Sequence, residues 1–350
     1  MLVVPSVLLA LLCIWIVIPP LNPPTIVASV ASIELSPYLL LINAALLFLA
    51  VRSRARFRSL AVGAAALSVV CCALPVGAAL LQGLPVGFPV LSSPTVPVVE
   101  LDIPVQLGDV RTAIHAYLPP DGTRNPIVFA IYGGAWQTGT PQNDAILNRN
   151  LARRGYAVFA LDYRHAPKYQ FPVALQDVHQ QVDLITRTAA TYRADSRRLA
   201  IMGHSSGGEL AELSVFAPHS KFRALISYSG AVDLAKGYEV VPIPDPISVR
   251  SIIFKYMGDT PANMPARYRA ATPLMQVRAG LPPTLLIYGT RDHVVDIRYA
   301  WKFRDEIRNR GNDVTFLELP WTEHAFEDAP YGLHSPMAFA AVTAFLQRTL

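Results

Sequence analysis

The sequence has little charge for its length. Asp, Glu, Lys and Arg make up 16% of its 350 residues, against about 25% in ordinary globular proteins. The deficit lies in residues 1–99, which hold five charged side chains, whereas residues 100–350 hold the other 50. This split excludes a wholly disordered chain, a simple cytosolic enzyme and a transporter that fills the entire sequence. It predicts a membrane-embedded front followed by one soluble domain.

Cysteine is scarce as well, and the soluble part has none. Cys13, Cys71 and Cys72 lie in the apolar front, so residues 100–350 carry neither a disulfide framework nor a cysteine metal site. The eight histidines form no H-x-H or H-x-x-x-H grouping, and we predict no metal and no cofactor. The soluble part has 26 basic and 24 acidic residues, a net charge of +2, so we expect no nucleic-acid partner.

Three apolar runs in the front are candidate transmembrane helices, at residues 2–18, 35–51 and 59–81. A helix needs about 20 residues, and at least about 17, to span the hydrocarbon core. The third run meets this length with 23 residues, while the first two are at the limit with 17 each. We therefore predict a membrane region over residues 1–82 with two or three transmembrane helices. Buried helices of a soluble protein, or a signal peptide over residues 1–20, are the alternatives.

Four arginines lie between the second and third apolar runs, in the segment from Arg52 to Arg58. Because loops rich in Lys and Arg stay on the cytoplasmic side, we predict that this loop is cytoplasmic. If the third run crosses the bilayer, everything after residue 83 is extracytoplasmic, and with three spans the N-terminus is cytoplasmic. Residues 83–99 are uncharged and contain four prolines, which predicts a stiff, extended linker.

Residues 100–350 alternate between short apolar runs and helical patterns. Alternation of this kind predicts a doubly wound, mostly parallel sheet, and active sites in such sheets form beyond the carboxyl ends of the strands. The candidate strands are residues 98–105, 113–118, 127–132, 157–162, 199–203, 224–229, 284–288 and 314–319; the candidate helices are residues 144–153, 173–191, 208–216, 297–309 and 336–346.

The segment Gly203-His204-Ser205-Ser206-Gly207 lies directly between a candidate strand and a candidate helix. This is the G-x-S-x-G pattern in a meaningful context, because its glycines permit a sharp turn that lifts the serine hydroxyl above the sheet. The amino end of the following helix favours negative charge that develops there. The pattern predicts Ser205 as a nucleophile, and a tight turn capped by a serine is the alternative.

A glycine-rich segment, Tyr132-Gly133-Gly134-Ala135-Trp136, follows another candidate strand. Its small residues allow backbone N–H groups to point into a site, where such groups can hold an oxyanion. Together with the preceding motif, the segment predicts an oxyanion loop. The alternative is a simple glycine-rich turn.

Two residues late in the chain can activate a serine. Asp292 and His324 each follow a candidate strand, and the order Ser205, Asp292, His324 is typical of serine hydrolases built on parallel sheets. In that chemistry the histidine accepts the serine proton and the carboxylate orients the histidine. The competing candidates are Asp296 for the acid, and His293 and His334 for the base.

With these motifs the soluble part resembles the α/β-hydrolase superfamily. The resemblance lies with the group that includes hormone-sensitive-lipase-like carboxylesterases and bacterial feruloyl-esterase-like and kynurenine-formamidase-like enzymes. It covers about residues 100–349 and includes residues 161–167 (LDYRHAP) and 171–178 (FPVALQDV), which are similar to family segments that pack beside the active site. It implies an α/β-hydrolase fold, with an eight-stranded sheet and helices on both faces. One departure is Tyr132, where the family usually has histidine.

The resemblance also implies roles for individual residues. Residues 231–281, a long connection between two strands, would form a cap over the site, with a solvated helical insertion as the alternative. The implied nucleophile, acid and base are Ser205, Asp292 and His324, and the implied oxyanion donors are the backbone N–H groups of Gly134, Ala135 and Ser206.

The whole sequence therefore predicts a membrane-anchored serine hydrolase. It would cleave carboxylic esters of a small molecule or a lipid through an acyl-enzyme on Ser205, with no cofactor. An acyltransferase with the same three residues, and a hydrolase-like membrane binding module without catalysis, are the alternatives.

Overall fold

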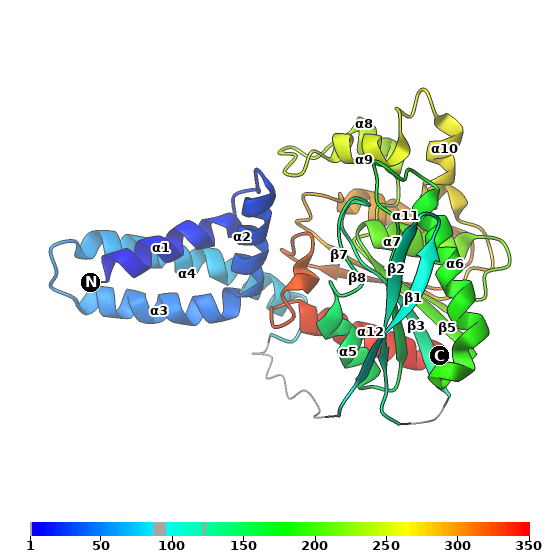
Figure 1. The fold of residues 1–350 in the computed structure, drawn as a ribbon. Helices are drawn as coiled ribbons and strands as arrows, with labels where there is room; N and C mark the ends of the chain where they lie inside the picture. The colour runs from blue at the N-terminus through cyan, green and yellow to red at the C-terminus, as the bar shows by residue number, and fades with distance from the viewer. Residues whose placement is uncertain (1, 87–95, 122–123) are drawn as a thin grey trace.

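The computed structural model describes residues 2–86, 96–121 and 124–350. A group of N-terminal helices lies beside an α/β domain (Figure 1). The middle of the expected linker, residues 87–95, lies outside the described residues.

An eight-stranded sheet forms the centre of the α/β domain. Its strand order is β1-β2-β4-β3-β5-β6-β7-β8, and β2 is antiparallel to both β1 and β4 while the remaining neighbours are parallel. The expected mostly parallel sheet is therefore confirmed. The strands are β1 (Val99–Leu107), β2 (Val110–Leu118), β3 (Asn125–Ile131), β4 (Ala157–Leu161), β5 (Ala194–His204), β6 (Ala224–Tyr228), β7 (Thr284–Gly289) and β8 (Val314–Leu319).

Helices cover both faces of the sheet (Figure 1). Neighbouring residues of one strand, such as Val128 and Phe129, enter separate buried clusters because side chains of a strand alternate between its faces. Central strands such as β6 are buried along their whole length, which explains their uninterrupted apolar sequence. One cluster holds α5 (Ala145–Ala152) and α12 (Ser335–Thr349), and the other holds α6 (Val173–Thr188), α7 (Ser206–Phe216) and α11 (Ile297–Asn309).

The long connection at residues 231–281 folds into short helices beyond one end of the sheet (Figure 1). Its apolar residues, such as Ile253 and Met257, pack into the same buried cluster as α7 and α11. The segment is therefore a packed part of the domain. Its helices are α8 (Leu234–Glu239), α9 (Val249–Met257), α10 (Pro265–Ala270) and the 3₁₀ turn η3 (Pro273–Gln276).

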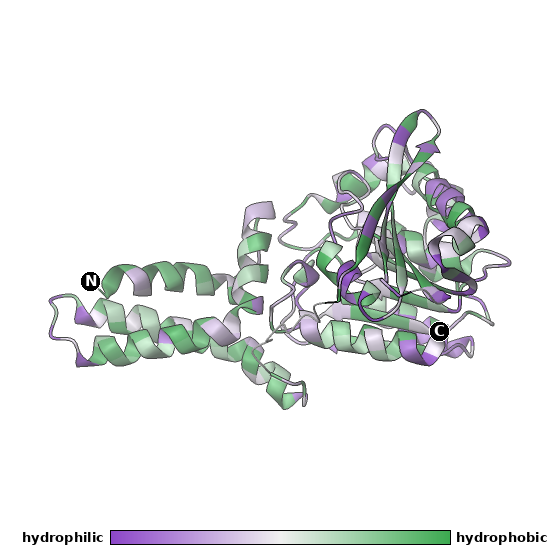
Figure 2. Ribbon diagram, turned by 60° about the horizontal axis from the view of Figure 1, so that its bottom comes forward, coloured by the Kyte–Doolittle hydropathy of each residue, from purple (hydrophilic) through white to green (hydrophobic). Residues whose placement is uncertain are grey.

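The N-terminal helices follow the three apolar runs closely. Among the described residues, one helix, α4, is long and apolar enough to cross a bilayer. Helices α2 and α3 are bent by 75° relative to each other and would supply a second span if the pair forms a single broken span. Figure 2 shows how apolar these helices are along most of their length. The elements are α1 (Val3–Cys13), the 3₁₀ turn η1 (Ile14–Ile16), α2 (Pro23–Glu34), α3 (Ser36–Arg52) and α4 (Arg58–Leu81).

Helix α2 lies in a stretch that the apolar runs leave as a connection between two spans. Its start has a clear local cause. The Asn22 side chain accepts a hydrogen bond from the Thr25 backbone N–H, and the Thr25 hydroxyl oxygen accepts one from the Asn22 backbone N–H, which completes a capping box. Prolines at the first helical positions add to this signal. The apolar runs alone therefore do not signal this helix, whereas its capping residues do.

Candidate active site

Ser205 occupies the sharp turn between β5 and α7. Its backbone has φ = 52°, a conformation that a residue with a side chain adopts only when its surroundings enforce it. The flanking glycines explain how the turn fits, because a Cβ on Gly203 would overlap the Gly207 carbonyl, and a Cβ on Gly207 would overlap the Ile131 carbonyl. The Ser205 N–H donates to the Tyr228 carbonyl at 2.8 Å, which ties the turn to β6.

The side chains of Ser205, His324 and Asp292 form a continuous hydrogen-bonded chain. His324 Nε2 lies 2.9 Å from Ser205 Oγ, and His324 Nδ1 lies 2.8 Å from Asp292 Oδ2. The other carboxylate oxygen of Asp292 accepts the backbone N–H groups of Val294 and Val295 at 2.8 and 2.7 Å. Asp292 is thus fixed by its own loop, and one oxygen is left for the histidine.

Nearby charges stabilise the protonated form of His324. Burial alone would lower the pKa of His324, but the adjacent Asp292 carboxylate outweighs burial and holds the pKa above its ordinary value. An imidazolium is therefore stabilised where the chemistry of a serine nucleophile needs one.

The competing candidates lie in other contacts. Asp296 caps α11 and pairs with Arg298, so its carboxylate is used within its own helix. His293 pairs with Glu323 at 2.6 Å, and His334 pairs with Glu34 of α2 at 2.7 Å. Of the candidates named from the sequence, the structure brings together Ser205, Asp292 and His324.

The glycine-rich segment after β3 folds over the Ser205 turn. Gly134 has φ = 145°, and Ala135 and Trp136 have φ values of 56° and 58°, so this loop turns tightly. Gly134, Ala135 and Ser206 line the same cavity as Ser205 and His324. Ser206 is the first residue of α7, where backbone N–H groups have no partner within the helix.

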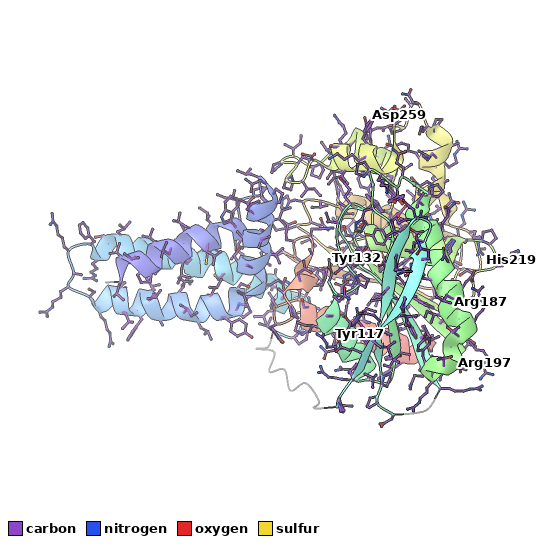
Figure 3. The ribbon with its side chains drawn as sticks, viewed as in Figure 1. Tyr117, Tyr132, Arg187, Arg197, His219 and Asp259 are labelled. Carbon is purple, nitrogen blue, oxygen red and sulfur yellow. The ribbon has the colours of Figure 1, made fainter. Side chains whose placement is uncertain are left out.

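Tyr132, at the start of this loop, supports it through its hydroxyl and its ring. Its hydroxyl donates to Asp162 Oδ1 at 2.6 Å and lies 2.9 Å from His165 Nε2, and its ring stacks on Tyr163 with centroids 4.6 Å apart. The labelled Tyr132 in Figure 3 lies inside the domain. The LDYRHAP segment therefore positions the loop, which is the structural role expected from the sequence.

Comparison with known proteins identifies the family of the chain. The BD-FAE family model matches residues 114–307, more than half of the chain. The chain belongs to the BD-FAE family.

Other relatives of this BD-FAE protein are carboxylic ester hydrolases by name. The chain is 29% identical over 217 residues to the probable carboxylic ester hydrolase LipM of Mycobacterium tuberculosis, covering 58% of this chain and 49% of LipM. It is 28% identical to esterase LipC of the same organism, covering 71% and 63%. It thus spans about half to three-fifths of these relatives' length. The crystal structure of a Pyrobaculum calidifontis esterase shares its fold, with a TM-score of 0.64, 21% identity and coverage of 73% and 86%.

A cavity of about 440 Å³ lies beside Ser205 and His324, a volume typical of small-ligand sites. Ile26 of α2 also lines the cavity. This helix precedes the segment that the BD-FAE family model matches, and no sequence motif signals its contribution. The residues 231–281 supply most of the apolar wall, namely Ala231, Val232, Leu234, Val240, Pro242, Ile247, Val249, Ile252 and Ile253.

A second histidine lies under the Ser205 turn. His204 is buried, stacks on Tyr228 with centroids 4.4 Å apart, and lies 3.0 Å from Glu327 and 4.0 Å from Asp144. Burial would lower the pKa of His204, but the carboxylates of Asp144 and Glu327 outweigh burial and raise it to about 9. His204 therefore carries a charge near pH 7 that holds the turn to the loop after His324. The sequence offers no local signal for this pairing.

No group of three His, Cys, Asp or Glu side chains in the described parts of the chain is arranged to hold a metal ion.

Proposed function

We propose that this protein is a serine hydrolase that cleaves carboxylic esters. The observation that carries the proposal is the unbroken chain from Ser205 Oγ through His324 to Asp292, at 2.9 and 2.8 Å. Ser205 Oγ attacks the ester carbonyl while His324 Nε2 takes its proton, and the carbonyl oxygen becomes an oxyanion. The intermediate collapses when His324 returns the proton to the leaving alcohol, and an acyl-enzyme remains on Ser205.

The second half of the reaction uses the same groups. His324 takes a proton from water, the hydroxide adds to the acyl carbonyl, and the carboxylic acid leaves as the proton returns to Ser205. The backbone N–H groups of Gly134, Ala135 and Ser206 hold the oxyanion in both steps, and each such donor is worth about 2.7–4 kcal/mol. The names of LipM and LipC support esters as the substrate class.

We also propose that the protein is anchored in a membrane. The interior of the N-terminal bundle holds small and polar side chains, including Cys13, Asn43, Ser68 and Cys72, all fully buried. Its outer surface carries large apolar side chains, such as Leu8 at 61% exposure. A water-soluble bundle has the reverse arrangement, whereas membrane helices pack through small and polar residues and turn apolar ones to lipid.

The orientation follows from where the arginine loop lies. The N-terminus and the loop between α3 and α4 are at one end of the bundle, and the hydrolase domain is at the other (Figure 1). With the arginine loop in the cytoplasm, the hydrolase domain is extracytoplasmic.

Active-site labelling tests mechanism and orientation together. A membrane-impermeant fluorophosphonate should label the protein in intact cells, and Ser205→Ala should abolish both the labelling and the hydrolysis of p-nitrophenyl acetate. Ser220→Ala, four residues beyond the end of α7 at Phe216, is the matched control and should behave as wild type. Labelling only after lysis contradicts the orientation, and hydrolysis by Ser205→Ala contradicts the mechanism. Formation of a new ester when an alcohol is added would indicate acyl transfer.

A further inference from the structure

Helix α2 is a wall of the catalytic cavity. Ile26 lines the same cavity as Ser205, His324 and the cap residues Val240 and Pro242. Helix α2 therefore reaches the cavity next to Ser205 and takes part in forming the site.

Buried polar contacts fix α2 in this position. Glu34, at the end of α2, is fully buried. Its carboxylate accepts the His334 N–H at 2.8 Å and lies 2.7 Å from His334 Nδ1, and its carbonyl accepts the Leu333 N–H at 2.9 Å. A Cβ on Gly332 would overlap the Glu34 carboxylate, so the two segments are in close contact. Contacts of this kind hold a helix in one place because an unpaired buried carboxylate is costly.

The bend between α2 and α3 sets the direction of α2. The two helices differ in direction by 75°, and α2 lies across the end of the bundle (Figure 1). If α3 and α4 cross the bilayer, α2 lies nearly parallel to its surface, as interfacial helices do. The mouth of the cavity beside Ile26 is then at the level of the lipid headgroups.

Apolar side chains are exposed on both sides of this mouth. On α2 Val27 is 68% exposed, and on the cap loop at residues 240–247 Val240 is 53% and Ile243 is 95% exposed. Figure 1 shows this loop, which lies between α8 and α9, projecting towards the N-terminal end of α2. Exposed apolar residues gathered around a cavity are typical of a surface that contacts a membrane.

We infer that α2 and the cap loop form a lipid-facing entrance, and that the substrate is a long-chain ester drawn from the bilayer. The acyl chain lies along the apolar wall made by Ile26 and the cap, which places its carbonyl carbon at Ser205. Attack by Ser205 Oγ releases the alcohol, which takes the proton from His324, and water then frees the fatty acid. The inference rests on the proposed ester hydrolysis and adds the class of substrate.

Substitution of Ile26 tests the wall. In detergent-solubilised full-length protein, Ile26→Trp should lower kcat/KM for p-nitrophenyl palmitate by about tenfold or more, since a hydrophobic pocket discriminates about 10–200-fold per methylene of misfit. p-Nitrophenyl acetate, whose two-carbon acyl group uses little of the apolar wall, should change less than about twofold. Leu8→Trp, at an exposed position of α1 away from the cavity, is the control and should leave both substrates unchanged.

Substitution of the cap loop tests the entrance. Ile243→Glu should slow oleate release from dioleoylglycerol in phosphatidylcholine vesicles by about tenfold to a hundredfold, the effect of losing one large apolar side chain from the lipid contact. The soluble acetate ester should be unaffected. Met275→Glu, also exposed in the insertion at 61%, is the control and should leave vesicle hydrolysis unchanged.

Rates are normalised to fluorophosphonate labelling, which counts folded active sites. Equal effects of Ile26→Trp on both ester lengths, or full vesicle activity of Ile243→Glu, would overturn the inference while Ser205-dependent hydrolysis still stands. Hydrolysis that survives in Ser205→Ala would overturn the proposed function itself.

Discussion

The Tyr132 hydroxyl is the clearest place to test how the oxyanion loop is held. Tyr132→Phe removes one oxygen and keeps the ring that stacks on Tyr163. Burial lowers the pKa of His165, so its neutral ring donates from Nε2 to the Tyr132 oxygen while the hydroxyl donates to Asp162. The substitution therefore removes one hydrogen bond to a carboxylate and one between neutral groups.

The expected cost follows from these two bonds. A hydrogen bond to a charged group is worth about 1.5–3 kcal/mol and a neutral one about 1 kcal/mol, so the free energy of unfolding should fall by about 2.5–4 kcal/mol. In this variant the Asp162 carboxylate still accepts hydrogen bonds from the Tyr163 N–H, at 2.8 Å, and from the Thr112 hydroxyl. We therefore expect the loss of unfolding free energy to lie near the lower end of this range.

The effect on activity should differ from a simple loss of stability. Gly133, Gly134 and Ala135 follow Tyr132 directly, so a shifted Tyr132 moves the donors that hold the oxyanion. Because those donors act mainly in the transition state, kcat for p-nitrophenyl acetate should fall about tenfold or more while KM stays close to wild type.

The matched control is Tyr117→Phe. Tyr117 is a buried tyrosine whose hydroxyl has no hydrogen-bond partner among the described residues, and Figure 3 labels it with Tyr132. Chemical denaturation and steady-state kinetics should give wild-type values for this control. Wild-type kcat and stability for Tyr132→Phe would refute the assignment of Tyr132 as the support of the loop.

Three further predictions follow from the site. Asp292→Asn should lower kcat about 10⁴-fold, and because it removes the carboxylate that raises the pKa of His324, the acid limb of the pH–rate profile should move to lower pH. Gly207→Ala should prevent folding or cost several kcal/mol in chemical denaturation, because its Cβ would overlap the Ile131 carbonyl. His204, with a pKa raised from 6.5 to about 9, should stabilise the fold by about 3 kcal/mol below pH 6.5 and lose this as pH rises to about 9. The free energy of unfolding of His204→Gln, measured at both ends of this pH range, should not show this decrease.

The sheet could be predicted from the sequence because its strands carry a local signal. Buried parallel strands are continuous apolar runs, and each of the eight expected runs overlaps a strand of the structure. The limits differ most at β5 (Ala194–His204), which begins five residues before the expected start. Its first residues pair with β3 across a register shift, a tertiary contact that apolar runs do not signal.

The triad motifs could be found for a similar reason. Ser205, Asp292 and His324 each follow the end of a strand within five residues, so the expected sheet also places them at one edge. Their catalytic roles stay predictions, although the structure brings them within hydrogen-bond distance. Neither the pairing of His204 with Glu327 nor the position of Ile26 has such a local signal, because each joins segments more than a hundred residues apart.

The N-terminal helices contact the same loops that carry Asp292 and His324. Arg291, next to Asp292, donates to the Val17 carbonyl at 2.9 Å and lies over the Trp321 ring. Trp321, three residues before His324, packs against the buried cluster of the bundle, and His334 pairs with Glu34 on the other side of the loop. A histidine that takes a proton from serine must keep its distances to the serine and to its carboxylate partner within a fraction of an ångström. The bundle therefore belongs to the scaffold that sets this geometry, and a change in how it sits relative to the domain acts on Asp292 and His324 as well as on the cavity wall at Ile26.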